Sequence, residues 1–331
     1  MDVFRSSPAC CMDMLRSLAL FGIFACHIFC LMEDIKQNSM RAWILAARPK
    51  TLAAAIAPVA VGCALAYYFN AFQWVPALCC LLFAVAMQIA ANLINDLYDF
   101  LKGSDGEDRL GPPRATAMGW ITPDRMKMGI LVVVAMGCLF GSVLMLYVGW
   151  WLVGVGIFCV LFAYFYTSGP FPLAYNGLGD VAVVAFFGLV AVGFTAYVQI
   201  LSWPVALTLA GIATGLAVNV LLVLNNYRDV ENDAKSGKRT VVVLLGKQFG
   251  LYLYLCSGVA AVLLVGVLCY MLGMPLYMFL LMMPYLLMHA MTWNKIRKID
   301  QPALLNALIG ETSRNMMLFA VLLSAMLVFF H

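Results

Sequence analysis

Long apolar runs alternate with short polar segments along most of this chain. Reading each run of about 17 to 25 apolar residues as one membrane-spanning helix predicts nine helices. Their ranges are 51–69, 74–99, 126–147, 149–167, 180–200, 203–228, 248–270, 275–292 and 314–331. The runs Trp74 to Ile94 and Trp203 to Leu224 are 21 and 22 residues long, enough at about 1.5 Å per residue to cross a hydrocarbon core of about 30 Å.

The composition agrees with this pattern. Of 331 residues, 64% are hydrophobic and only 11% are charged, and the mean hydropathy is +0.94. A soluble domain cannot build a polar surface from these residues. The prediction is therefore an all-α, polytopic helical bundle in a lipid bilayer, with nine helices around a central cavity.

Positive charges orient the predicted bundle. From Arg41 onward, Lys and Arg lie before the first span, in the loops after the second, sixth and eighth spans, or at those helix ends. The turns at the other side carry none. The positive-inside rule therefore places the basic loops and the acidic clusters in the cytoplasm. The expected location is the cytoplasmic (inner) membrane. The net charge of +4 is split among short loops, which argues against a nucleic-acid partner.

The beginning of the chain does not fit the pattern. Residues 17–32 form a 16-residue apolar run, which is short for a span and lacks a typical signal-peptide cleavage site. It is interpreted as a tenth helix, as an uncleaved targeting segment or, preferably, as sequence upstream of the true start. The domain prediction is an extension over residues 1–40 and a single transmembrane domain over 41–331. The eleven cysteines lie mostly in apolar runs, so no disulfide framework is predicted.

Two of the spans end in an acidic cluster and then enter a basic loop. In the first, spacings of three and four connect Asn92, Asn95, Asp96 and Asp99 and put all four on one helical stripe. Asp105 follows in the loop. In the second, Asn225, Asp229 and Asp233 stand at intervals of four. The repeated Asn-x-x-x-Asp indicates two related half-bundles that face one cavity.

Several carboxylates this close repel one another unless a cation neutralises them. Oxygen ligands without Cys or His favour Mg²⁺, which commonly binds one or two carboxylates together with substrate phosphates. The alternative is a purely structural set of polar helix caps. Under the metal interpretation the expected ligands are Asn95, Asp96, Asp99, Asp105, Asn225, Asp229 and Asp233, with Asp99 and Asp229 as the catalytic pair. Cations around these clusters are expected to hold a diphosphate; they are Lys102, Arg109, Arg114, Arg228, Lys238 and Arg239.

Four segments together resemble the UbiA superfamily of intramembrane prenyltransferases. They are ARPKTL, NDLYDFLKGSDGEDRLGPPRA, YTSGPFPLAYNGLGD and NNYRDVENDAKSGKRT, in the family's order. The resemblance covers Arg41 to the C-terminus and implies a polyprenyl diphosphate donor, magnesium and an aromatic acid acceptor. By this resemblance, the family's first motif corresponds to Asn95, Asp99 and Asp105, and its second motif corresponds to Asn225, Asp229 and Asp233.

The first motif has Gly103 where the hydroxybenzoate enzymes of the family have Asp. The resemblance is therefore closest to the branch that acts on 1,4-dihydroxy-2-naphthoate, and implies prenyl transfer with loss of carbon dioxide in menaquinone biosynthesis. Candidate acceptor contacts are Tyr98, Tyr166, Tyr175 and Asp180. Another aromatic acceptor stays open, as does a cation or solute transporter, although transporter sites usually lie near the bilayer midplane. The sequence predicts neither the prenyl chain length nor the oligomeric state.

Overall fold

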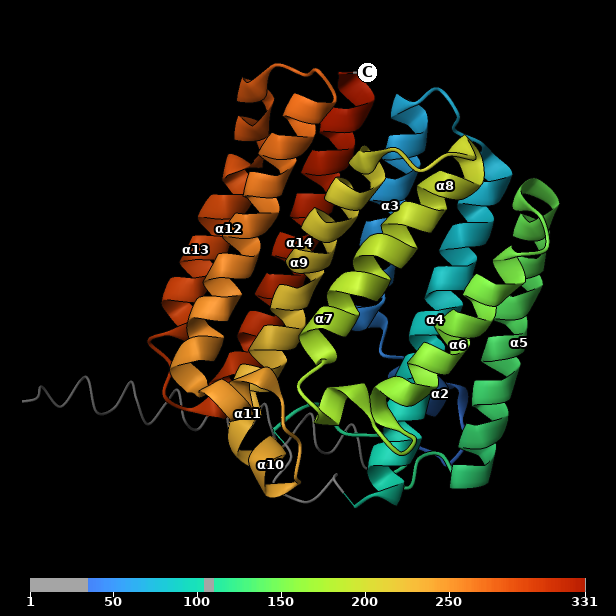
Figure 1. Ribbon diagram of the computed structural model, residues 1–331. Helices are drawn as coiled ribbons and strands as arrows, with labels where there is room; N and C mark the ends of the chain where they lie inside the picture. The colour runs from blue at the N-terminus through green and yellow to red at the C-terminus, as the bar shows by residue number, and fades with distance from the viewer. Residues whose placement is uncertain (1–34, 104–109, 331) are drawn as a thin grey trace, which may run out of the picture.

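The computed structural model describes residues 35–103 and 110–330, and these residues form a bundle of helices without a strand (Figure 1). The longer helices are α2 (Met40–Ala47), α3 (Ala53–Tyr68), α4 (Trp74–Leu101), α5 (Pro123–Val148), α6 (Leu152–Thr167), α9 (Val205–Arg228), α12 (Lys247–Met271), α13 (Met283–Ile296) and α14 (Leu305–Phe329). One further span is built in three parts: α7 (Gly179–Val183), the π-helical stretch η3 (Val184–Phe194) and α8 (Thr195–Ile200). Two short helices, α10 (Val230–Lys235) and α11 (Val241–Leu245), lie beyond α9.

The all-helical prediction is confirmed for the described residues. Seven helical segments there are long and apolar enough to cross a membrane, and an eighth is added if the bent pair Met40–Thr51 and Ala53–Tyr68 counts as one span. The bend between the members of that pair is 51°. Helix α6 is apolar but shorter. The nine-span count and the relation between two halves therefore stay predictions.

Proline and glycine set several helix ends. Helix α5 begins at Pro123, and α9 begins directly after Pro204. Proline is tolerated in the first turn because the N–H groups there have no partner within the helix. Gly246 separates α11 from α12 with φ 91°, a left-handed conformation that residues with a Cβ avoid. The ends of α4 and α9 lie at the same end of the bundle, where α10 and α11 also lie (Figure 1).

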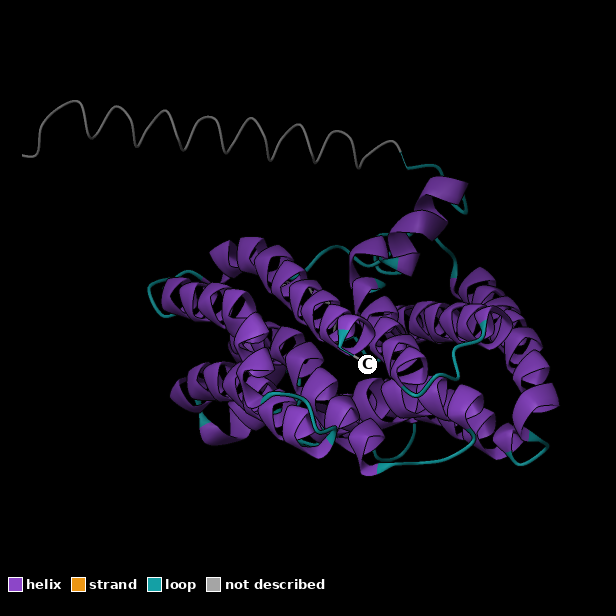
Figure 2. Ribbon diagram, turned by 90° about the horizontal axis from the view of Figure 1, so that it is seen from above, coloured by secondary structure: helices purple, strands orange, loops and turns teal. Residues whose placement is uncertain are grey.

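Helix α9 is the most enclosed span and α5 the least. In the most apolar 18-residue stretch of α9, 67% of the residues are buried inside the protein, whereas the corresponding value for α5 is 11%. Small residues let α9 approach η3 closely, because a Cβ on Gly188 would lie 2.4 Å from the carbonyl oxygen of Gly211. Viewed from above, the helices form one bundle (Figure 2). Residues of α9 pack in the main core cluster with residues of α3, α12 and α14.

Residues just before α2 pack on the bundle. Ile35 is buried, the backbone N–H of Asn38 donates to the carbonyl of Trp120 at 2.7 Å, and Ser39 caps α2. The predicted boundary at residue 41 therefore falls inside a packed region. The earlier apolar run, residues 17–32, lies outside the described residues.

A cavity of about 510 Å³ lies among α3, α4, α5, α6, η3 and α9. Its walls are mostly aliphatic and aromatic, and a few amides and hydroxyls interrupt them. Asn95, Tyr166 and Asn225 line the end that faces the acidic clusters. The predicted cavity therefore exists, and it has a polar end and an apolar body.

Candidate active site

The two predicted clusters meet at the polar end of this cavity. Asn95 of α4 and Asn225 of α9 both line it, although 130 positions separate them in the chain. The side chain of Asn95 accepts a hydrogen bond from the hydroxyl of Thr167, at the end of α6. Three helices therefore converge where the sequence placed two half-sites.

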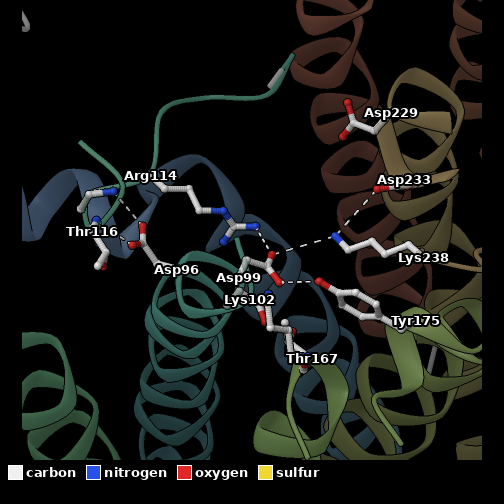
Figure 3. Close-up of polar contacts among 12 residues, drawn as sticks. Asp96, Asp99, Lys102, Arg114, Thr116, Thr167, Tyr175, Asp229, Asp233 and Lys238 are labelled. Carbon is white, nitrogen blue, oxygen red and sulfur yellow. Dashed lines mark hydrogen bonds and ion pairs between the residues drawn. The ribbon is translucent and has the colours of Figure 1, made fainter. Parts of the chain in front are cut away.

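Asp99 is the most connected carboxylate of the first cluster. Its side chain is 3% exposed and pairs with Arg114. The hydroxyl of Tyr175 donates to its Oδ1 at 3.0 Å, and the ammonium of Lys238 lies 4.0 Å from its Oδ2. These partners come from three separate loops, and Figure 3 shows them arranged around Asp99.

Lys238 joins the two clusters. Its Nζ also lies 3.8 Å from Oδ1 of Asp233 (Figure 3). Burial raises the pKa of the Asp233 carboxyl to about 6, and the negative charges of Asp229 and Asp99 act in the same direction. Lys238 and Arg228 oppose that rise. The two acidic motifs therefore share one electrostatic environment.

Asp229 is held by its sequence neighbour. Arg228 donates to both of its carboxylate oxygens, at 2.7 and 2.5 Å, in a bidentate pair. A third guanidinium nitrogen of Arg228 donates to Asn306 at 2.8 Å. Arg228, expected to hold diphosphate, is thus engaged with a carboxylate and an amide.

Asp96 lies on the predicted stripe but points to a different partner. It accepts hydrogen bonds from the backbone N–H groups of Ala115 and Thr116, both at 2.8 Å, and is 1% exposed. Figure 3 shows it turned toward this loop and away from Lys238. Asn92 likewise donates to the carbonyl of Ala47 and the hydroxyl of Thr51, both at 2.9 Å. Both side chains fasten neighbouring segments to α4.

Cations from both basic loops surround Tyr175. The Nζ of Lys102 donates to the carbonyl of Thr167 at 2.6 Å and lies 4.5 Å from the centre of the Tyr175 ring. Lys238 lies 5.0 Å from the same ring centre. Partial desolvation and the nearby Lys238 lower the pKa of Lys102, while Asp99 raises it. The N–H of Arg239 donates to the Tyr175 carbonyl at 3.0 Å.

The other predicted acceptor contacts are spread around the cavity. Tyr166 lines it, whereas Tyr98 packs edge-on against Tyr164 with ring centres 5.4 Å apart. Asp180, at the start of α7, accepts a hydrogen bond from Asn219 at 3.0 Å. Asp105 and Arg109 lie outside the described residues.

The carboxylate and amide oxygens of the two motifs are ligands that suit a magnesium ion, although they do not enclose a metal site by themselves. Within residues 35–103 and 110–330, no three Asp, Glu, His or Cys side chains gather closely enough to hold an ion. The Lys238 ammonium lies where Asp99 and Asp233 come together, so a cation already occupies the space between the motifs. Open oxygen sites of this kind suit Mg²⁺, which keeps waters and uses substrate phosphates as ligands.

Sequence reasoning missed three contributors. Thr167 contacts both Asn95 and Lys102, Asn219 pairs with Asp180, and Asn306 holds Arg228. Thr167 ends an apolar run directly before Ser-Gly-Pro, which is a recognisable helix end. Asn219 is a lone polar residue inside an apolar span, and such residues often mark function.

The chain matches the model of the UbiA prenyltransferase family over residues 55–319. It belongs to this family. A 1,4-dihydroxy-2-naphthoate octaprenyltransferase of Haemophilus influenzae is 36% identical over 302 residues, covering 87% of this chain and 96% of that protein. The enzyme of the same name from Mycobacterium tuberculosis is 40% identical over 208 residues, covering 63% and 71%.

Solved structures agree on the fold of this UbiA-family chain. A UbiA homologue from Archaeoglobus fulgidus, bound to DMAPP and Mg²⁺, has a TM-score of 0.60 at 16% identity and covers 86% of this chain and 99% of its own. The apo structure of a homologue from Aeropyrum pernix has a TM-score of 0.63 at 15% identity and covers 85% and 98%. At these identities the likeness concerns the fold alone.

Proposed function

We propose that this protein transfers a polyprenyl group from polyprenyl diphosphate to 1,4-dihydroxy-2-naphthoate, with loss of carbon dioxide, in menaquinone biosynthesis. The observation that carries the proposal is that Asn95 and Asn225 open onto one apolar cavity, while Asp99 and Asp233 flank one lysine. Relatives at 36% and 40% identity that bear the naphthoate enzyme's name support the choice of acceptor.

The diphosphate of the donor would lie at the polar end of the cavity. Lys102, Lys238 and Arg114 surround that place, and Arg donates to phosphate oxygens in pairs while Lys acts as a point charge. Magnesium would be held by the family's motif residues present there: Asn95, Asp99, Asn225, Asp229 and Asp233. When bound, it would stabilise the negative charge of the leaving diphosphate.

The residues of the chain suit a carbocation mechanism. The allylic C–O bond breaks with its electron pair leaving on the diphosphate, where the fixed cations of the site stabilise it. The apolar walls of the cavity exclude water from the allylic cation. The electron-rich ring supplies the pair for the new C–C bond, and departure of carbon dioxide returns a pair to the ring. Tyr166, at the polar end, is positioned to contact the acceptor.

The orientation follows from the basic loops. Lys102, Arg114 and Lys238 lie at the end of the bundle where α4 and α9 finish. The positive-inside rule supports a site that faces the cytoplasm from the inner membrane. Counting α3 with its bent partner and α6 as spans, in addition to the seven long helices, gives the nine-helix topology.

The test is a product assay on the purified protein. It is incubated in detergent with magnesium, a polyprenyl diphosphate and a panel of aromatic acids, and prenylated product and released carbon dioxide are measured. We expect product and carbon dioxide with the naphthoate. Asp99→Ala and Asp229→Ala should each abolish turnover, whereas Asp124→Ala, on an exposed pair with Lys127, should not. Near-normal turnover in either of the first two variants would overturn the paired-site assignment.

A further inference from the structure

Amide side chains form a polar stripe along one wall of the cavity. Gln88, Asn92 and Asn95 of α4 all line it, at spacings of four and three that put them on one helical face. Gln88 is the farthest of the three from the acidic clusters and lies seven residues, or about 10 Å along the helix axis, from Asn95. It therefore presents an amide to the body of the cavity, where most of the lining is apolar.

The hydrogen bonds of Asn92 fix which way its own amide faces. Its Nδ2 donates to the carbonyl oxygen of Ala47 and to the hydroxyl of Thr51, both at 2.9 Å. The carbonyl can only accept, and the Thr51 hydroxyl already donates its proton to the carbonyl of Arg48 at 2.9 Å. The NH₂ group of Asn92 must therefore point toward these two partners, which leaves its Oδ1 facing Gln88.

This orientation decides what Gln88 offers to the cavity. Because the Asn92 Oδ1 is an acceptor, Gln88 turns its NH₂ end to it, and Nε2 donates at 3.4 Å. Within residues 35–103 and 110–330, no donor reaches the other end of the Gln88 amide, the carbonyl oxygen Oε1. A hydrocarbon tail cannot supply a donor, and a carbonyl enclosed without one is unfavourable. The ligand that lies here is therefore expected to bring an O–H or N–H group.

The surroundings of Gln88 suit a flat aromatic ring. Alanines line the cavity one turn before and one turn after it on α4, at Ala84 and Ala91. Helix α6 and the π-helical η3 add aromatic walls, where the rings of Phe162 and Phe186 stack. The small side chains leave room for a ring, and the aromatic faces can pack against it.

We propose that Gln88 determines acceptor specificity by accepting a hydrogen bond from the 4-hydroxyl of the naphthoate. This inference rests on the proposed function and assigns one contact of its acceptor. The ring must lie near the diphosphate end, because the allylic carbon that it attacks is bonded to the diphosphate. The acceptor carboxylate is drawn to the cations at that end. The 4-hydroxyl, which is not adjacent to the carboxylate on the ring, then points deeper, toward Gln88.

The same contact distinguishes oxidation states of the ring. A ring with a 4-hydroxyl donates to Oε1 of Gln88, whereas a quinone has a carbonyl there, and two carbonyl oxygens cannot form a hydrogen bond. The contact therefore retains the reduced acceptor and does not retain an oxidised product. A site built to bond a hydroxyl also rejects analogues that lack it, because its own polar group is then left without a partner.

The first experiment compares three acceptors on the wild-type protein without donor. Fluorescence titration in detergent, in the absence of oxygen, measures the affinity for 1,4-dihydroxy-2-naphthoate, 1-hydroxy-4-methoxy-2-naphthoate and 1-hydroxy-2-naphthoate. We expect the dihydroxy acid to bind at least tenfold more tightly than the other two, since only its position 4 can donate. Equal affinity for all three overturns the contact, and is the result expected if water alone bonds to Gln88.

The second experiment assigns this preference to Gln88. Gln88→Met keeps the length of the side chain without its polar atoms, and Gln301→Met makes the same change at an exposed position outside the cavity lining. Gln88→Met should weaken binding of the dihydroxy acid alone and bring the three affinities within about twofold of one another. Gln301→Met should keep the wild-type preference. Gln88→Leu takes the place of Gln88→Met if the latter does not fold, and an undiminished preference in a folded Gln88 variant overturns the assignment.

A transfer assay on the wild type separates this inference from the proposed function. If the wild type prenylates the naphthoate but binds the three acids equally, the Gln88 contact is wrong and the proposed function stands. If the wild type prenylates none of the three acids from any donor, the proposed function is wrong, whatever the binding preference.

Discussion

Lys238 provides the sharpest test of the electrostatics at this site. Its ammonium lies 4.0 Å from a carboxylate oxygen of Asp99 and 3.8 Å from one of Asp233. At about 4 Å and an effective dielectric constant of about 20, each pair is worth at most about 4 kcal/mol. The Lys238 side chain is 21% exposed, so screening reduces that figure.

Replacing Lys238 with Met should therefore have two effects of opposite sign. Without the ammonium, one cation fewer competes for the oxygens of Asp99 and Asp233, and magnesium should bind the donor-free protein about tenfold more tightly, or about 1.4 kcal/mol. The diphosphate loses a point charge at the same time. A loss of about 2 kcal/mol in the transition state would lower kcat/KM for the donor about 30-fold.

Isothermal titration with Mg²⁺ and steady-state kinetics measure these two quantities. Lys235→Met is the matched control, because it removes the same charge from an exposed position three residues away. It should leave both values within about twofold. Unchanged or weaker magnesium binding in Lys238→Met would refute the idea that the lysine and the metal share one place.

Three further predictions follow from the packing and charges. Asp96→Asn should lower the free energy of unfolding by about 1 to 3 kcal/mol, because its carboxylate accepts two backbone N–H groups of the following loop; thermal unfolding checks this. In magnesium-free buffer, Asp233, with its pKa raised to about 6 from 3.8, holds its proton more tightly when folded. This tighter binding of the proton stabilises the folded state by about 3 kcal/mol below pH about 4, and the stabilisation is lost as the pH rises through about 6. The Tm should therefore fall over that interval in the wild type but not in Asp233→Asn. Gly188→Ala should cost about 1 to 3 kcal/mol, since its Cβ would lie 2.4 Å from a backbone oxygen of Gly211, whereas Gly154→Ala should be neutral in a detergent melting assay.

Hydropathy alone predicted the helices and the place where the two acidic motifs meet. The expected spans 74–99 and 203–228 correspond closely to α4 (Trp74–Leu101) and α9 (Val205–Arg228). This succeeds because a bilayer admits only helices of a minimum apolar length, so span length fixes where the polar ends lie. Two helices that begin at the same face of the membrane therefore both end at the opposite face.

The partners of individual side chains could not be predicted in this way. Helical spacing put Asp96 and Asp99 on one stripe, but Asp96 turns to the loop at residues 115 and 116, while Asp99 contacts Tyr175 and Lys238. Periodicity gives the direction in which a side chain leaves its helix. It contains no information on which distant loop arrives there, and these loops are placed by tertiary packing.

The residues that line the cavity could not be identified in the sequence for a different reason. In a soluble protein, apolar and polar positions separate the core from the surface. In a membrane, a residue that faces lipid and one that faces an apolar cavity have the same chemical preference. In the sequence, Val153 and Ile157, which line the cavity, therefore cannot be distinguished from apolar residues that face only lipid. Only the arrangement of the helices distinguishes them.

Charge balance explains why donor and metal should arrive together. The ion pairs in the described part of the site join three acids to three bases: Asp99, Asp229 and Asp233 to Arg114, Arg228 and Lys238. A diphosphate that entered alone would add negative charge beside buried carboxylates, and magnesium alone would add positive charge beside buried cations. Either is unfavourable where water is scarce. Under the proposed function, a diphosphate with its divalent ions would keep the site near neutrality. Each carboxylate could then exchange its present cation for a metal while that cation turned to phosphate.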